Sequence, residues 1–125
     1  MEQLKQTIFV CDDNADSCEL IKMVFQLEGY EVASCDNLDD CLSQARQNNF
    51  DAIILDNRFG QVSSLEACRE IPEFNQSVPI NFYSGETRAS EIDKALKAGA
   101  NAYLVKPNDF ERLTETEINL IKNWV

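Results

Sequence analysis

Short apolar runs alternate along this chain with longer segments in which hydrophobic residues recur at helical spacing. The short runs are four or five residues long and rich in β-branched or aromatic side chains, which is typical of buried strands. They lie at residues 7–11, 31–35, 52–55, 79–83 and 102–105. Between two of these runs, Leu38, Cys41, Leu42 and Ala45 fall at positions i, i+3, i+4 and i+7. That spacing places them on one face of an amphipathic helix.

The other intervening segments carry similar stripes, so the chain reads as five strand–helix units. The stripes comprise Leu20, Ile21, Val24, Phe25 and Leu27; Leu65, Cys68 and Ile71; Ala89, Ile92 and Leu96; and Phe110, Leu113, Leu120, Ile121 and Trp124. Gly29 and Gly99 follow two of them, where a helix commonly ends on a left-handed residue. Regular alternation of strand and helix predicts an α/β fold, with a parallel sheet covered by helices on both faces.

Composition narrows the class of protein without naming a function. A chain of 125 residues suits one domain, and we expect residues 1–125 to form it without an output domain. The net charge of −11 argues against nucleic acid as a partner and suits a cation or a basic protein surface. The sequence has neither a membrane-spanning run nor a signal-peptide core, so we expect a cytoplasmic protein without membrane contact.

The numbers and spacing of cysteine and histidine residues argue against several kinds of catalytic and metal site. The five cysteines, Cys11, Cys18, Cys35, Cys41 and Cys68, include no CxxC pair, so the spacing indicates neither a zinc site nor a dithiol redox couple. We expect them to pack as small buried hydrophobes. The chain has no histidine, which excludes Ser-His and Cys-His catalysis and a phosphohistidine on this chain.

Reactive side chains follow four of the five predicted strands. In an open parallel sheet the ligand crevice lies at the carboxyl ends of the strands, so these residues should meet there. They are Asp12 and Asp13, then Asp56, Ser84, and Lys106 with Pro107. Each is an ordinary strand-end or turn residue when taken alone. Together, three carboxylates suit Mg²⁺, while a lysine and a hydroxyl suit a phosphoryl oxygen, so Asp56 could act as a carboxylate nucleophile.

The sequence resembles the receiver domain of two-component response regulators over essentially its whole length. The matching stretches are VCDDN, AIILD, INFYSG and AGANAYLVKP, of which the last is the most specific. The resemblance implies a flavodoxin-like (βα)5 fold with a doubly wound sheet of order 2-1-3-4-5. It implies that Asp56 is the phosphoacceptor, and that Asp12 and Asp13 help Asp56 to hold Mg²⁺. Ser84 and Lys106 would engage the phosphoryl group, and the peptide bond before Pro107 would be cis.

The resemblance also implies a switch and reveals departures from the family pattern. Tyr103 matches the switch aromatic, which would follow Ser84 inward and change the face formed by the fourth helix, fifth strand and fifth helix. Gly60 stands where the family usually has proline, which predicts a more flexible loop. We expect Arg58 to offer its backbone carbonyl to the metal. Its side chain and Glu86 should interact across the mouth of the site and modulate the loss of the phosphoryl group.

The resulting hypothesis is a phosphorylation-dependent signalling switch rather than an enzyme. A histidine kinase or a phosphotransfer protein would supply the phosphoryl group, as in a phosphorelay, and a downstream protein would read the output from a monomer or weak dimer. The alternative is an interaction module of the same fold that works without phosphorylation. A metal-dependent phosphohydrolase is disfavoured because the first strand lacks a DxD pattern, and a flavin site is disfavoured because CDDNADS is acidic.

Overall fold

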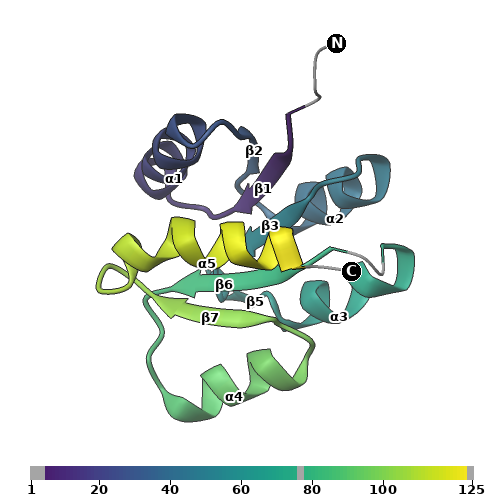
Figure 1. Cartoon of the computed structure of the whole chain (residues 1–125). Coiled ribbons are helices and arrows are strands. Elements are labelled where there is room, and N and C mark those ends of the chain that lie inside the picture. The colour runs from purple at the N-terminus through teal and green to yellow at the C-terminus, as the bar shows by residue number, and fades with distance from the viewer. Residues whose placement is uncertain (1–4, 76–77, 124–125) are drawn as a thin grey trace.

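A five-stranded parallel sheet forms the centre of the molecule (Figure 1). The computed structural model describes residues 5–75 and 78–123. The strands are β1 (Thr7–Cys11), β2 (Glu31–Cys35), β3 (Ala52–Leu55), β6 (Ile80–Ser84) and β7 (Ala102–Val105). Their order is β2-β1-β3-β6-β7, and every neighbouring pair is parallel. The predicted α/β class and the 2-1-3-4-5 order of the main strands are confirmed.

Helices cover both faces of the sheet, as the apolar strands require (Figure 1). Helices α1 (Ala15–Leu27) and α5 (Phe110–Asn123) pack on one face, and α2 (Leu38–Gln47), α3 (Leu65–Phe74) and α4 (Ala89–Lys97) pack on the other. Alternation along β1 divides its side chains between the two layers. Ile8 and Val10 face α1 and α5, whereas Phe9 and Cys11 face the opposite layer.

A short hairpin lies in the connection between β3 and α3, where the sequence predicted only a loop. Its strands are β4 (Arg58–Phe59) and β5 (Val62–Ser63), which pair in antiparallel orientation. Gly60 turns between them with φ of +61°, a conformation that side chains with a Cβ rarely adopt. Strands of two residues are too short to show an alternation of apolar and polar residues in the sequence. Gly60 therefore occupies the turn of this hairpin.

The predicted stripe on α1 was too broad. Ile21 and Phe25 are buried, but Leu20 is 48% exposed and Leu27 is 82% exposed. A single helix face can meet the sheet, so residues on its flanks remain in solvent. Trp124, assigned to the stripe of the last helix, lies outside the described residues.

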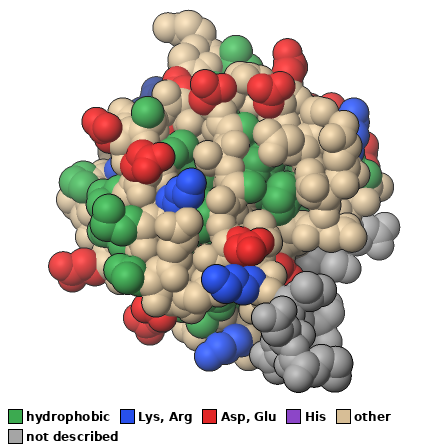
Figure 2. Space-filling view, turned by 90° about the horizontal axis from the view of Figure 1, so that it is seen from above, with side chains coloured by type: hydrophobic (Ala, Val, Ile, Leu, Met, Phe, Trp, Pro, Cys, Tyr) green, Lys and Arg blue, Asp and Glu red, His purple; other side chains and the backbone are tan. Residues whose placement is uncertain are grey.

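The surface carries charge of both signs, with acidic side chains in excess. Figure 2 shows acidic groups spread over the visible face, with basic groups between them rather than in a separate basic patch. No helix within residues 5–75 and 78–123 combines the length and the apolar character needed to cross a membrane.

Candidate functional site

Three carboxylates meet at the carboxyl edge of the sheet. Asp12 and Asp13 follow β1, and Asp56 follows β3, which is the direct neighbour of β1. One carboxylate oxygen from each lies within 4.8 Å of the others. The register that pairs Cys11 with Leu55 brings the ends of the two strands level, so Asp12 and Asp56, 44 positions apart in the sequence, become adjacent. This clustering of oxygens has the donor chemistry that Mg²⁺ prefers.

Lys106 joins two of these carboxylates. Its Nζ atom lies 2.5 Å from Oδ2 of Asp12 and 3.4 Å from Oδ2 of Asp56. The ammonium group lies closer to Asp12, which is the more deeply buried of the two acids. The Lys106–Pro107 peptide bond is cis. The ammonium group thus sits between the first and third strands, although it comes from the end of β7.

Electrostatics at this edge leave negative charge in excess. Burial raises the pKa of Asp12, and the charge of Asp56 acts in the same direction, while Lys106 opposes both. Burial lowers the pKa of Lys106, but the two carboxylates outweigh that effect and raise it above the usual value. One ammonium therefore faces three acids. A bound cation would relieve the remaining repulsion, because opposite charges at a few ångströms interact strongly in a partly buried site.

A pocket of about 500 Å³ opens beside Asp13, Asp56 and Ser84. The Asp13 side chain accepts a hydrogen bond of 3.0 Å from the backbone N–H of Gly60, which attaches it to the turn of the β4–β5 hairpin. The Ser84 hydroxyl is buried and accepts a bond of 3.3 Å from the backbone N–H of Glu86. Two carboxylates and a hydroxyl group therefore share one solvent-accessible space.

Tyr103 points toward this pocket from β7. Its hydroxyl donates to the backbone carbonyl of Glu86 at 3.0 Å and accepts from Nδ2 of Asn57 at 3.3 Å. Its ring stacks on Phe82 with centroids 5.7 Å apart. The side chain therefore connects the residue after Asp56 with the loop after Ser84. A group added to Asp56 would alter the surroundings of this hydroxyl through Asn57.

The expected interaction between Arg58 and Glu86 is absent from the described contacts, and each residue has another partner. The guanidinium of Arg58 lies 3.8 Å from the carboxylate of Glu91 in α4, and Glu86 pairs with Arg88. Arg88 follows Glu86 by two residues, so their side chains meet at lower entropic cost than two groups on separate loops. Arg58 and Glu86 nevertheless both line the pocket that Asp56 and Ser84 share.

Sequence reasoning missed three buried polar residues around the site and beneath it. Asn57 is buried and contacts Tyr103, and Ser64 is fully buried and donates to the backbone carbonyl of Asp56. Glu117 in α5 is also fully buried, with its Oε2 atom 3.4 Å from Nδ2 of Asn81. Asn81 was a visible signal as the one amide in an apolar strand, but nothing in the sequence identified Glu117 as its partner.

Comparisons with known proteins agree with this architecture. Residues 8–117 match the model of the response regulator receiver domain. The transcriptional regulatory protein ZraR of Salmonella typhimurium is 35% identical over 112 residues, which is 90% of this chain and 25% of ZraR. The transcriptional regulatory protein ResD of Bacillus subtilis is 30% identical over 86% of this chain and 45% of ResD. The chain therefore spans less than half the length of these relatives.

Solved structures show the same fold. The response regulator TrrA of Thermotoga maritima, crystallised with Mg²⁺ and BeF, is 30% identical, with a TM-score of 0.82 over 92% of this chain and 98% of TrrA. A two-component response regulator of Clostridium difficile has a TM-score of 0.88 at 21% identity, over 95% of this chain and 98% of that one. The match over residues 8–117 assigns the chain to the family of response regulator receiver domains, which are phosphoacceptor signalling domains.

Proposed function

We propose that this chain is a signalling switch that accepts a phosphoryl group on Asp56 in the presence of Mg²⁺. The observation that carries the proposal is the meeting of three carboxylate oxygens within 4.8 Å beside a lysine and a buried serine hydroxyl. The related TrrA structure contains Mg²⁺ and BeF, which supports the same ligand chemistry here. Asp12, Asp13 and Asp56 would hold the metal, together with the backbone carbonyl of Arg58. The metal would neutralise charge on the transferring phosphoryl oxygens.

The phosphoryl donor lies outside these 125 residues, because they contain no histidine. A carboxylate oxygen of Asp56 attacks the phosphorus of a phosphohistidine on a histidine kinase or phosphotransfer protein. The new P–O bond forms as the P–N bond breaks, and the electron pair returns to the donor imidazole, which takes up a proton. Lys106 and the Ser84 hydroxyl would bind oxygens of the transferred group. The product is an acyl phosphate on Asp56.

The output passes through Ser84 and Tyr103 to the surface of α4, β7 and α5. Phosphorylation adds roughly −1.5 to −2 charges and strong acceptor oxygens at Asp56. Ser84 donates to the new oxygens, and the hydrogen bonds that Tyr103 makes with Asn57 and the Glu86 carbonyl hold its ring toward the pocket. A downstream protein would recognise the altered surface around Tyr103.

Acetyl phosphate with Mg²⁺ should label the chain with one phosphoryl group, detected as a mass increase in the intact protein. Asp56→Asn should abolish labelling, because an amide oxygen is a poor nucleophile. Asp36→Asn, an exposed acid at the end of the neighbouring strand β2, should label as the wild type does. Magnesium binding without any labelling of the wild type would instead favour an interaction module that works without phosphorylation.

Arg58 and Glu86 should extend the lifetime of the phosphorylated form. They flank the pocket that holds Asp56, so their side chains limit the approach of water to the acyl phosphate. Arg58→Ala and Glu86→Ala should each accelerate loss of the phosphoryl group about twofold to tenfold, the range expected for a modest change in barrier. The rate is measured by intact mass after removal of acetyl phosphate. Arg69→Ala, an exposed arginine in α3, is the control, and unchanged lifetimes in both pocket variants would refute this role.

A further inference from the structure

Three cysteine sulfurs converge directly beneath the acidic cluster, on the side of the sheet that faces α2. Cys11 ends β1 and Cys35 ends β2, and the two residues are register partners in the parallel pair. Cys41 lies in the first half of α2. All three side chains are buried, and their Sγ atoms lie within 4.8 Å of one another. Packing as small hydrophobes explains their burial, but it does not require the sulfurs to converge.

The three sulfurs match the dimensions of a thiolate metal site. Zn–S bonds are about 2.3 Å long, so sulfurs around one ion stand about 4 Å apart. The Sγ atoms of Cys11 and Cys41 are 2.8 Å apart, so they would separate by roughly 1 Å on binding an ion. The carboxylates of Asp12, Asp13 and Asp56 form a separate group of oxygen donors. The thiolates are soft ligands and the carboxylates are hard ligands, so the two clusters favour different metals.

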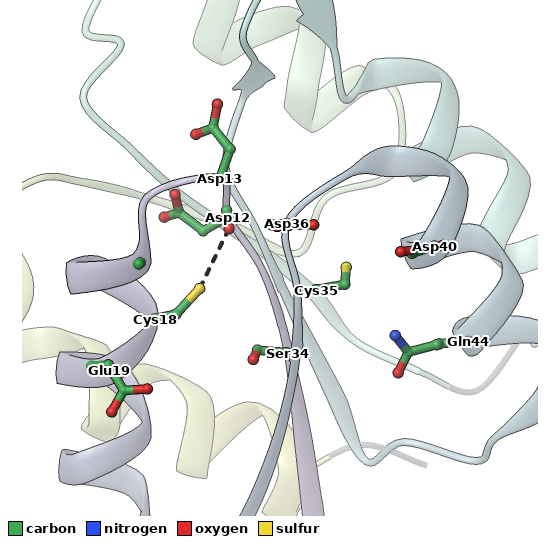
Figure 3. A pocket seen from close by; sticks show the side chains of 10 residues that line it. Asp12, Asp13, Cys18, Glu19, Ser34, Cys35, Asp36, Asp40 and Gln44 are labelled. Carbon is green, nitrogen blue, oxygen red and sulfur yellow. Dashed lines mark hydrogen bonds between the residues drawn. The ribbon is translucent and has the colours of Figure 1, made fainter.

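The surroundings of Cys35 provide both a supporting hydrogen bond and an entry route. The backbone N–H of Asn37 acts to lower the pKa of Cys35, which favours the thiolate form that a metal ligand requires. A pocket of about 400 Å³ reaches Cys35 from solvent. Figure 3 shows the Cys35 side chain projecting toward α2, with Asp36 and Asp40 nearby. Acidic groups at the entrance raise the local concentration of cations.

We propose that Cys11, Cys35 and Cys41 form a second metal site, which takes a soft d10 cation, either Zn²⁺ or Cu⁺. The bonds formed are three metal–sulfur bonds, and the thiol protons pass to solvent without any change in oxidation state. A three-coordinate site suits Cu⁺, whereas Zn²⁺ would complete its tetrahedron with water. The remaining cysteines do not take part. Cys18 contacts the backbone carbonyl of Asp12 and Cys68 that of Ala98.

The test is metal titration of the full chain, reduced and kept free of oxygen. Co²⁺ serves as an optical probe of Zn²⁺ sites, and thiolate ligation gives an intense sulfur-to-metal charge-transfer band in the near ultraviolet. We expect that band at one equivalent, its loss on adding Zn²⁺, and no effect of a large excess of Mg²⁺. A parallel titration with Cu⁺, using a chromophoric competitor, determines which of the two ions binds more tightly.

Variants separate the thiol site from other donors. Cys35→Ser and Cys41→Ser should each weaken binding at least about a hundredfold, since each removes one of three thiolates. Cys18→Ser and Asp13→Asn should bind the ion as the wild type does. Circular dichroism checks that each variant is folded. The charge-transfer band of the wild-type protein tests thiolate ligation independently, even if a variant fails to fold. Absence of the band, binding that survives both serine variants, or binding lost in Asp13→Asn would overturn the proposal. So would a reduced protein that binds no metal and only forms a Cys11–Cys41 disulfide in air.

Discussion

Replacing Lys106 with methionine is expected to separate metal binding from phosphorylation. The ammonium lies 2.5 Å from Asp12 and 3.4 Å from Asp56, so its removal leaves the three acids without their cation. Mg²⁺ should then bind several-fold more tightly, because it no longer shares the site with a positive charge. Phosphorylation by acetyl phosphate should slow at least about tenfold, because the phosphoryl oxygens lose a charged partner. Calorimetric titration with Mg²⁺ and the rate of intact-mass labelling measure the two effects.

The matched control is Lys97→Met, which removes a lysine that pairs with Asp93 on the surface of α4. An exposed pair of this kind contributes little, so neither magnesium affinity nor labelling should change. If Lys106→Met lowers both magnesium affinity and the labelling rate, the lysine is acting as a structural support for the acids. That result would contradict the expected gain in magnesium affinity, and the slower labelling would then reflect the loss of bound metal.

Replacing Glu117 with glutamine is expected to stabilise the protein at neutral and alkaline pH. Burial raises the pKa of Glu117 to about 8, and a hydrogen bond from Asn81 only partly offsets that effect. The folded carboxyl therefore keeps its proton over a range in which the unfolded chain, with an ordinary pKa near 4.5, has lost it. In that range the folded state binds more protons, so the free energy of unfolding falls as pH rises. Glutamine is neutral at every pH and also carries both a donor and an acceptor.

The measurement compares urea unfolding of the wild type and Glu117→Gln between pH 5 and pH 8. The difference should be small at pH 5 and grow by up to about 1.4 kcal/mol for each pH unit, until the folded carboxyl itself ionises. The wild type is the less stable protein at the upper end. Glu115→Gln, an exposed position two residues earlier in α5, should show no such growth. A pH-independent difference between wild type and Glu117→Gln would show that Glu117 is not a buried neutral acid.

The order of strands and helices follows from local pattern. Runs such as residues 7–11 and 52–55 are too short and too uniformly apolar for amphipathic helices, and parallel strands buried on both faces need such runs. The same pattern predicts where Asp12, Asp56 and Lys106 lie, because residues that follow the strands of a parallel sheet share one edge of it. The β4–β5 hairpin could not be predicted in this way, since two-residue strands carry no periodic signal.

Contacts between side chains were decided only by the tertiary structure. The sequence identified Arg58 and Glu86 as neighbours across the site, yet Arg58 meets Glu91 and Glu86 meets Arg88. The basic side chain that pairs with a given carboxylate depends on the path of each loop and on competing charged groups a few ångströms away. The periodicity of hydrophobic residues carries no information about either. The pairing of Asn81 with Glu117 likewise depends on how α5 rotates over the sheet.

The cysteines show the same limit. By itself the sequence determined the fold class, the edge of the sheet where the chemistry lies and the residues that reach it, because these depend on periodicities of two and 3.6 residues. It contained no CxxC spacing, so the three cysteines appeared unrelated. Only the parallel register of Cys11 with Cys35 and the docking of α2 brought their sulfurs together with that of Cys41, because such convergence depends on long-range packing rather than on local spacing.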